Sequence, residues 1–317
     1  MVWSVLECVS SSLYAGKYLE DLKVNNMEFK TATTPILEIA YYEHGSPTGW
    51  PVLLLHGFPY DIHVYDEVVP LLTAQGARVI VPYTRGYGPT HFLSPSTMRT
   101  GQQAALGSDV IALMDALNLE KAVLAGFDWG GTAAWVAASL WPERVAGVVG
   151  FEIVDRARQG KSFAPASEHV MWYQHLFQSE RGRDCLSRNR RELYRILLQQ
   201  WSPTWSFSDS FFEETVKSFD NPDFVDVVLH FYRHSFCSVD GDPALERLEE
   251  KLAQKPNITV PIITLTGNVD PLKTAPNQTM FTGKHERRVV NVGHAVPSEA
   301  PAAFLDAILT VREWSAA

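Results

Sequence analysis

An aspartate stands at the tip of a glycine-flanked turn in the stretch LAGFDWGGTA, residues 124–133. An apolar run at 122–125 leads into the turn and small residues at 132–139 follow it, so we expect a strand, a sharp turn and a helix. Turns of this kind present a nucleophile and usually read G-x-S-x-G, with serine at the centre. Here the pattern is GFDWG at 126–130, and Asp128 takes the central position. The sequence therefore predicts a carboxylate nucleophile.

Two candidate partners for Asp128 follow later strands of the chain. Asp270 comes after the apolar run at 260–265, and His294 comes after the run at 288–292. In parallel sheets ligands gather at the carboxyl ends of the strands, so we expect the three side chains on one edge. A histidine oriented by a carboxylate can activate water or another nucleophile.

Each of these residues has another interpretation when taken alone. Asp128 could be the N-cap of the helix that follows, Asp270 could form a turn before proline, and His294 could be an ordinary loop histidine. Their joint placement after three separate strands favours a shared site. Glu152, at the end of the apolar run at 148–151, is an alternative acid for the histidine, although it lacks the Gly and Pro that frame Asp270.

The elements that must position these residues alternate between strands and helices. Such alternation predicts an α/β fold with a doubly wound, mostly parallel sheet. We expect strands at 36–42, 51–55, 78–81, 122–125, 145–151, 260–265 and 288–292, and helices at 65–75, 101–117, 132–140 and 301–314.

The stretch after residue 154 changes in character. Residues 155–256 contain no convincing strand, are rich in Trp, Tyr, Phe and Arg, and are typical of several packed helices. We therefore predict a core made of residues 1–154 and 257–317, interrupted by a helical cap at 155–256.

The composition excludes several classes of protein. The net charge of -9 argues against nucleic acid or an anionic membrane as a partner. Cys8, Cys185 and Cys237 are widely spaced and show neither a disulfide framework nor a zinc motif, so we expect no metal. The N-terminal stretch lacks a basic region and carries Glu7, and no later run is long enough to span a membrane. We expect a cytoplasmic protein without membrane insertion.

Several motifs placed around the helical insertion resemble those of the α/β-hydrolase-fold epoxide hydrolases, and the resemblance covers nearly the whole chain apart from its N-terminal stretch. The chain order of Asp128, Asp270 and His294 is also the order of nucleophile, acid and histidine in α/β-hydrolases. The motifs are HGFP at 56–59, RGYG at 85–88, GFDWGG at 126–131, GNVDP at 267–271 and GH at 293–294.

The resemblance implies roles for residues outside the predicted triad. The backbone amides of Phe58 and Trp129 would form the oxyanion hole. Within the insertion, Tyr173 lies in a Y-Q-x-x-F-Q segment and Tyr232 in a segment similar to W-Y-R; both tyrosines would be ring-opening acids, unless they are only packing aromatics. The chain departs from the family where Phe231 replaces tryptophan and where Pro-Gly is absent after the first segment.

The chemistry of epoxides explains a carboxylate at the tip. Serine attacking an sp3 carbon would give an ether, which water does not readily cleave, whereas aspartate gives an ester that can be hydrolysed. The resemblance implies a small apolar or amphipathic epoxide as substrate, no cofactor, and a chain able to form a homodimer. The residues expected to line the substrate pocket are His56, Pro59, Trp129 and Trp172.

Two other functions stay open at this point. Haloalkane and haloacetate dehalogenases also use an aspartate nucleophile, and Trp129 could solvate a departing halide. A hydrolase fold that binds ligand without turnover is the other alternative. An intact Asp128, Asp270 and His294 argues against a binding protein.

Overall fold

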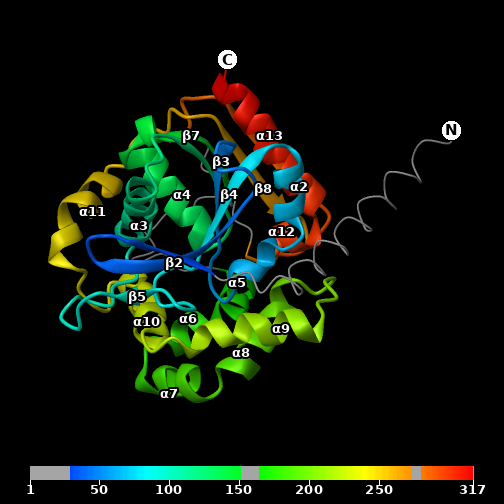
Figure 1. Ribbon diagram of the computed structural model, residues 1–317. Coiled ribbons are helices and arrows are strands. Elements are labelled where there is room, and N and C mark those ends of the chain that lie inside the picture. The colour runs from blue at the N-terminus through cyan, green and yellow to red at the C-terminus, as the bar shows by residue number, and fades with distance from the viewer. Residues whose placement is uncertain (1–28, 151–163, 273–279, 317) are drawn as a thin grey trace.

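The computed structural model describes residues 29–150, 164–272 and 280–316 (Figure 1). A single nine-stranded sheet runs through these residues in the order β1-β2-β4-β3-β6-β7-β8-β9, with β5 paired to β2. The strands are β1 (Lys30–Thr33), β2 (Leu37–His44), β3 (Trp50–Leu55), β4 (Ala77–Pro82), β5 (His91–Phe92), β6 (Ala122–Gly126), β7 (Val145–Gly150), β8 (Ile262–Gly267) and β9 (His285–Val290).

The sheet is parallel from β4 through β3, β6, β7 and β8 to β9, and antiparallel at the other edge, where β2 pairs with β1, β4 and β5. Every residue of β6 and of β8 is buried. Strands covered on both faces need apolar side chains on both, which explains their continuous apolar runs. The predicted doubly wound, mostly parallel sheet is confirmed.

Helices cover both faces of the sheet. In Figure 1, α3 and α4 lie on one side of the strands, and α2, α12 and α13 lie on the other. These helices are α2 (Val68–Ala74), α3 (Gln103–Ala116), α4 (Trp129–Leu140), α12 (Val296–Glu299) and α13 (Pro301–Ala316), with short 3-10 turns at Ile62–Tyr65 and Pro142–Arg144.

Most predicted elements differ from the observed ones by one to three residues at an end, and two of these differences have a clear physical cause. The chain at 65–75 is divided between a 3-10 turn and α2, which ends before Gly76 at a positive φ of 74°. Strand β9 begins at His285, earlier than the predicted 288. Strand β9 lies at the edge of the sheet, where polar residues are tolerated, and its first four residues are polar. The prediction followed the apolar residues, which begin late in the strand and continue beyond its end. Strands β1 and β5 were not predicted, because both are short and lack an apolar run.

The described residues between β7 and β8, from 164 onward, are mostly helical, as predicted. Its helices are α5 (Pro165–Val170), α6 (Trp172–Leu176), α7 (Glu180–Arg188), α8 (Arg190–Trp201), α9 (Asp209–Lys217), α10 (Phe224–Ser235) and α11 (Glu246–Ala253), with 3-10 turns at Ser218–Asp220 and Pro243–Leu245. We call the part containing α5 to α10 the helical insert. Figure 1 shows it below the sheet, whereas α11 lies beside α3.

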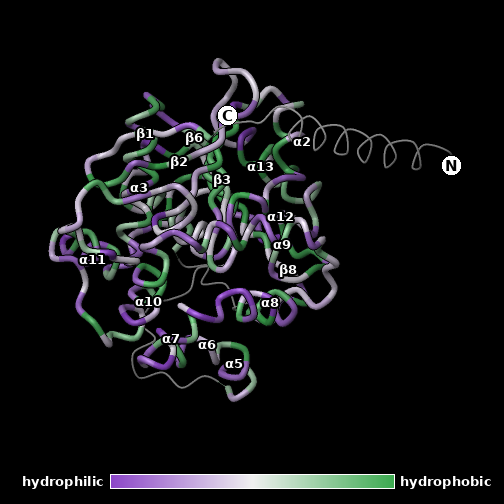
Figure 2. Tube along the Cα trace, turned by 60° about the horizontal axis from the view of Figure 1, so that its bottom comes forward, coloured by the Kyte–Doolittle hydropathy of each residue, from purple (hydrophilic) through white to green (hydrophobic). Residues whose placement is uncertain are grey.

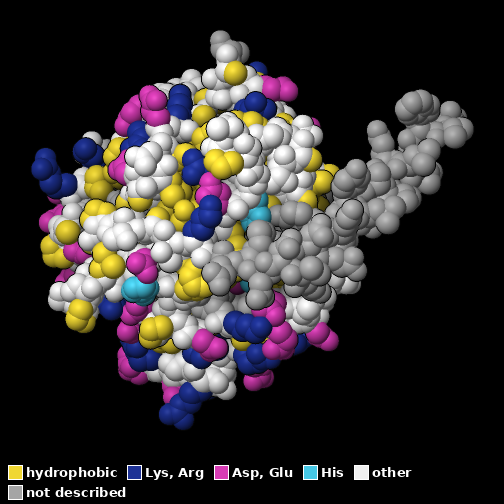
Figure 3. All heavy atoms as spheres, viewed as in Figure 1, with side chains coloured by type: hydrophobic (Ala, Val, Ile, Leu, Met, Phe, Trp, Pro, Cys, Tyr) yellow, Lys and Arg dark blue, Asp and Glu magenta, His cyan; other side chains and the backbone are white. Residues whose placement is uncertain are grey.

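The helical insert has a charged outer surface and an apolar inner one. Figure 3 shows acidic and basic side chains interspersed over its outer face. The ion pair between Arg191 of α8 and Glu213 of α9 is exposed. In Figure 2, the hydrophobic strands at the centre contrast with the mainly hydrophilic helix α7. Helix α8 buries Leu193, Leu197 and Trp201 on its inner side. Burial of this apolar face therefore holds the insert against the core.

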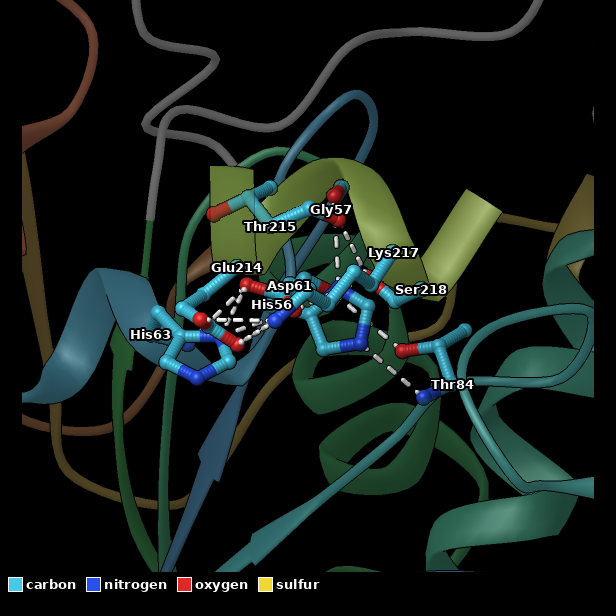
Figure 4. Close-up of polar contacts among 9 residues, drawn as sticks. All are labelled: His56, Gly57, Asp61, His63, Thr84, Glu214, Thr215, Lys217 and Ser218. Carbon is cyan, nitrogen blue, oxygen red and sulfur yellow. Dashed lines mark hydrogen bonds and ion pairs between the residues drawn. The ribbon is translucent and has the colours of Figure 1, made fainter. Parts of the chain in front are cut away.

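A buried carboxylate joins the insert to the core (Figure 4). Asp61 is 1% exposed; it accepts hydrogen bonds from the backbone N–H of His63 at 3.1 Å and from the hydroxyl of Ser218 at 2.8 Å. The His63 ring lies 2.9 Å from the same carboxylate. Burial lowers the pKa of His63, but the attraction of Asp61 outweighs it and raises the pKa to about 9. Near neutral pH, His63 and Asp61 therefore form an ion pair beneath the insert.

This pair predicts a specific pH dependence of stability. The pKa of His63 is about 9 in the folded protein and about 6.5 in an unfolded chain. The ion pair therefore contributes fully to the free energy of unfolding when the pH is below the pKa of the unfolded chain. This contribution is lost as the pH rises through the pKa of His63 in the folded protein. We expect the wild type to exceed His63→Gln in free energy of unfolding by the largest margin at mildly acidic pH. Urea unfolding across this range measures the difference.

His91→Gln is the matched control, because the His91 side chain is 51% exposed and its nearest carboxylate, on Glu38, lies 3.9 Å away. Its difference from the wild type should vary little with pH. A His63→Gln deficit that stays constant from acidic to alkaline pH would show that the ion pair does not stabilise the fold.

Candidate active site

Asp128 lies in a tight turn between β6 and α4. Its φ of 52° and ψ of -126° are strained for a residue with a side chain. The turn packs against the loop after β3, where a Cβ on Gly57 would collide with the Asp128 carboxylate, and a Cβ on Gly130 would collide with the carbonyl of Leu55. Glycine at both positions lets the two loops approach closely enough to share the carboxylate.

The two oxygens of Asp128 have different surroundings. Oδ1 accepts hydrogen bonds from the backbone N–H of Phe58 at 2.9 Å and of Trp129 at 2.7 Å. Oδ2 lies 3.6 Å from Nε2 of His294. The bond to Trp129 also makes Asp128 the N-cap of α4, so the capping interpretation and the site interpretation hold together. Two fixed amide donors converge on one oxygen, while the other oxygen faces the histidine.

His294 and Asp270 meet at the same edge of the sheet. Nδ1 of His294 lies 2.8 Å from Oδ2 of Asp270, whose Oδ1 accepts a hydrogen bond from the backbone N–H of Leu272 at 2.8 Å. Both side chains are almost fully buried. Burial lowers the pKa of His294, but Asp270 and then Asp128 outweigh it and raise the pKa to about 10. The imidazole is therefore charged while both carboxylates face it. The alternative acid, Glu152, lies outside the described residues.

Tyr173 of α6 and Tyr232 of α10 lie together on the insert side of the site. Their ring centroids are 5.3 Å apart, and both rings contact Phe58. Both side chains are buried. Burial raises the pKa of Tyr232 well above its usual value, and Tyr173 and Asp128 raise it further. Tyr232 therefore keeps its proton near neutral pH and is able to donate it in a hydrogen bond.

Aromatic rings enclose the space around these tyrosines. Phe58 packs between Trp129 and Phe177, with ring centroids at 5.7 and 5.9 Å. The Trp129 ring stacks on Phe231 at 4.1 Å. The phenylalanine that replaces the family's tryptophan therefore packs against the turn at residues 126–130, which we call the elbow. Trp201 at the end of α8 lies against Tyr173 and His294, each with a ring centroid 5.3 Å away. An apolar site surrounds the buried charges.

The residues predicted to line a substrate pocket are spread over different parts of this region. His56 and Trp129 border an internal cavity of about 30 Å³ behind the elbow, whereas Pro59 borders a narrow gap between the core and the insert. Trp172 borders neither of these, and its indole N–H donates to Gln200 at 3.2 Å.

His56 acts on the backbone around it. Its Nε2 accepts a hydrogen bond from the N–H of Thr84 at 3.0 Å, and its Nδ1 lies 3.3 Å from the carbonyl of Gly57 (Figure 4). Burial lowers the pKa of His56 to about 4, so the ring is neutral. This histidine braces the loop that carries Phe58.

Ser202 and Glu299 were not predicted, yet both contact the backbone around His294. The hydroxyl of Ser202 accepts a hydrogen bond from the N–H of His294 at 3.0 Å, and Glu299 accepts one from the N–H of Gly293 at 3.0 Å. A serine that follows a helix does not by itself indicate a functional residue. For Glu299 the one signal in the sequence is the stretch GH-x-x-P-S-E, which puts it five residues after His294.

Among the residues that the structure describes, no group of His, Cys, Asp and Glu side chains is arranged to hold a metal ion. In the same part of the chain, no helix is both long and apolar enough to cross a membrane.

Comparisons with known proteins place this chain in a family. The family model described as alpha/beta hydrolase fold matches residues 51–220. The crystal structure of a proposed epoxide hydrolase from Klebsiella pneumoniae is 40% identical, with a TM-score of 0.87 over 90% of this chain and 97% of that one. Epoxide hydrolase B of Mycobacterium tuberculosis is 32% identical over 41% of this chain, and the match spans only 40% of that protein.

A haloalkane dehalogenase from Psychrobacter cryohalolentis is 26% identical over 81% of this chain and 82% of its own length. The Klebsiella structure therefore shares the fold described here over nearly its whole length. The chain belongs to the alpha/beta hydrolase fold family, within which it is similar to epoxide hydrolases.

Proposed function

We propose that this protein hydrolyses epoxides to vicinal diols through an ester formed on Asp128. The observation that carries the proposal is the pair of amides on Oδ1 of Asp128, from Phe58 and Trp129. These donors keep one oxygen in place and leave Oδ2 for attack on carbon. They are also placed to stabilise the same oxygen when it becomes an oxyanion, an effect of about 3 kcal/mol per donor.

In the first step, Oδ2 of Asp128 attacks an epoxide carbon and forms a C–O ester bond. The bond between that carbon and the epoxide oxygen breaks, and the oxygen takes a proton from a tyrosine. Tyr173 and Tyr232 both serve this step, because an alkoxide is strongly basic and a neutral phenol can donate to it. The tyrosine proton is later restored from the solvent.

In the second step, His294 takes a proton from water, and the hydroxide adds to the ester carbon of Asp128. The oxyanion develops on Oδ1, and its collapse breaks the bond from the ester carbon to Oδ2. The departing diol oxygen takes the proton that His294 received from water, and Asp128 then loses the proton of its new hydroxyl to the solvent, which restores the carboxylate. Alkylation itself prepares the histidine for this role. It removes the charge of Asp128, which is one cause of the raised pKa of His294, so the imidazole loses its proton more easily once the ester has formed.

Asp270 supports this step from the far side of the ring. Its carboxylate orients the imidazole and stabilises the imidazolium that forms when water is deprotonated. The distance of 2.8 Å between Asp270 and Nδ1 of His294 supports this role. The aromatic rings around Phe58 favour a small apolar or amphipathic epoxide as the substrate.

The ester mechanism predicts that His294→Gln traps the intermediate. The variant keeps the nucleophile Asp128 but lacks the base for the second step, so alkylation should proceed while hydrolysis stops. Incubation with styrene oxide should add the mass of the epoxide to the peptide that contains residues 126–131, as measured by mass spectrometry. His91→Gln, which alters a histidine far from the site, should accumulate no adduct.

Asp128→Asn should form no adduct, because an uncharged amide is a poor nucleophile. If the wild type turns over the epoxide and His294→Gln carries the adduct on another peptide, or carries none, the ester on Asp128 is not the intermediate.

The ring-opening role predicts that the two tyrosines act together. Tyr173→Phe and Tyr232→Phe should each slow alkylation of Asp128, and the double variant should lose about 100-fold to 10,000-fold in rate, the usual range for general-acid catalysis. Each single loss should be smaller, because the second hydroxyl still holds the oxygen. Single-turnover kinetics on the His294→Gln background measures alkylation alone.

Tyr194→Phe is the control, because it also removes a buried hydroxyl from the insert. It should leave alkylation nearly unchanged. A double variant that alkylates at the parent rate would assign both tyrosines to packing rather than to chemistry.

One observation favours a second candidate function, the dehalogenation of haloalkanes. The indole N–H groups of Trp129 and Trp201 are buried and have no hydrogen-bond partner among the described residues. Weak donors of this kind suit a departing halide, which needs only diffuse solvation. Halide release measured beside epoxide turnover separates the two reactions, and saturable ligand binding without either reaction would indicate a binding protein.

A further inference from the structure

The loop that carries His294 is held by a buried hydroxyl from the insert. Ser202, at the C-terminal end of α8, is 1% exposed. Its Oγ accepts hydrogen bonds from the backbone N–H of His294 at 3.0 Å and of Ala295 at 3.2 Å. It donates its own proton to Oε1 of Glu299 at 2.7 Å. A hydroxyl has one proton and two lone pairs, so all three are used.

Glu299 of α12 completes this network. Its Oε2 accepts a hydrogen bond from the N–H of Gly293 at 3.0 Å, while its Oε1 takes the proton of Ser202. The carboxylate fixes the direction in which the hydroxyl donates and so turns both lone pairs of Ser202 toward the loop. Two side chains from different parts of the chain therefore hold three consecutive amides, those of Gly293, His294 and Ala295.

The same end of α8 also contacts the ring of the histidine. The carbonyl of Trp201 accepts from the backbone N–H of His294 at 3.0 Å. Its indole lies against the imidazole at a centroid distance of 5.3 Å and an interplanar angle of 70°. The same indole also contacts the ring of Tyr173, at a centroid distance of 5.3 Å. Helix α8 therefore connects the proposed base to the proposed acid.

We propose that Ser202 and Glu299 are positioning residues that hold His294 in place for ester hydrolysis, and that the insert acts on the second step through Ser202. This inference rests on the proposed function. Neither residue touches Asp128 or the tyrosines in the described contacts, so the first step should not depend on them. To take a proton from a bound water, the imidazole nitrogen must lie within hydrogen-bonding distance of it. The rate of ester hydrolysis therefore depends strongly on the position of His294.

The test compares the two half-reactions in Ser202→Ala. In the variant the amide of Ala295 loses its acceptor Oγ, and the amide of His294 keeps only the carbonyl of Trp201, so the loop should loosen. We expect alkylation of Asp128 by styrene oxide at the wild-type rate and hydrolysis of the ester slowed by about 10-fold to 100-fold, the scale of a small misplacement. Rapid-quench single-turnover experiments, with the ester measured by mass spectrometry, give both rates.

Glu299→Gln is the second variant, because it keeps the size of the side chain. The carboxylate accepts hydrogen bonds on both oxygens, whereas the amide has only one oxygen that accepts. It should show the same selective loss in the hydrolysis step. Ser298→Ala is the matched control. It removes a serine of the same short helix whose hydroxyl donates to the carbonyl of Val64 at 2.8 Å, away from the His294 loop.

The outcomes separate the inference from the function on which it rests. If Ser202→Ala and Glu299→Gln hydrolyse the ester at the wild-type rate, or slow both half-reactions equally, the positioning role is wrong. If the wild type turns over the epoxide but His294→Gln carries no ester on Asp128, the proposed function fails. Amide hydrogen exchange at Gly293, His294 and Ala295 then decides the inference: it should accelerate in both variants relative to Ser298→Ala, and unchanged exchange would overturn it.

Discussion

The hydrogen bonds from Phe58 and Trp129 to one oxygen of Asp128 connect the loops after β3 and β6, and the geometry of the whole site depends on them. Such contacts require the two loops to touch, which Gly57 and Gly130 permit. They also require Asp128 to adopt a strained backbone conformation, whose cost of about 1–3 kcal/mol is borne by the buried sheet on either side. The strain places a carboxylate where amides, histidine and substrate can all reach it.

A second constraint follows from burying charge beside this carboxylate. His294 lies between Asp128 and Asp270, and the two carboxylates keep the imidazole protonated despite its burial. An uncompensated charge in such a place would be costly, so the three groups are stable only as a unit. The proposed alkylation of Asp128 removes one charge from this unit. The electrostatic balance of the site therefore changes in the direction that frees the histidine to act as a base.

The helical insert contributes more than a cover over this site. Its inner face supplies Tyr173 and Tyr232 to the aromatic enclosure around Phe58. Its attachment to the core uses polar contacts as well as apolar burial, because Ser218 donates to the buried Asp61. The end of α8 also reaches the loop of His294 through Ser202. Placement of the insert and geometry of the core site are consequently linked.

The sequence by itself determined the parallel part of the sheet, the presence of a helical insert and the edge at which Asp128, Asp270 and His294 meet. Apolar runs encode strands, and the parallel arrangement places the residue after each strand on one side. Only the tertiary structure decided which oxygen of Asp128 takes the amides and which faces the histidine. It also decided that Ser202 holds the loop of His294 across 92 residues of chain. The physical reason is that periodicity encodes what a residue buries locally, whereas a hydrogen bond between distant segments depends on how whole elements pack.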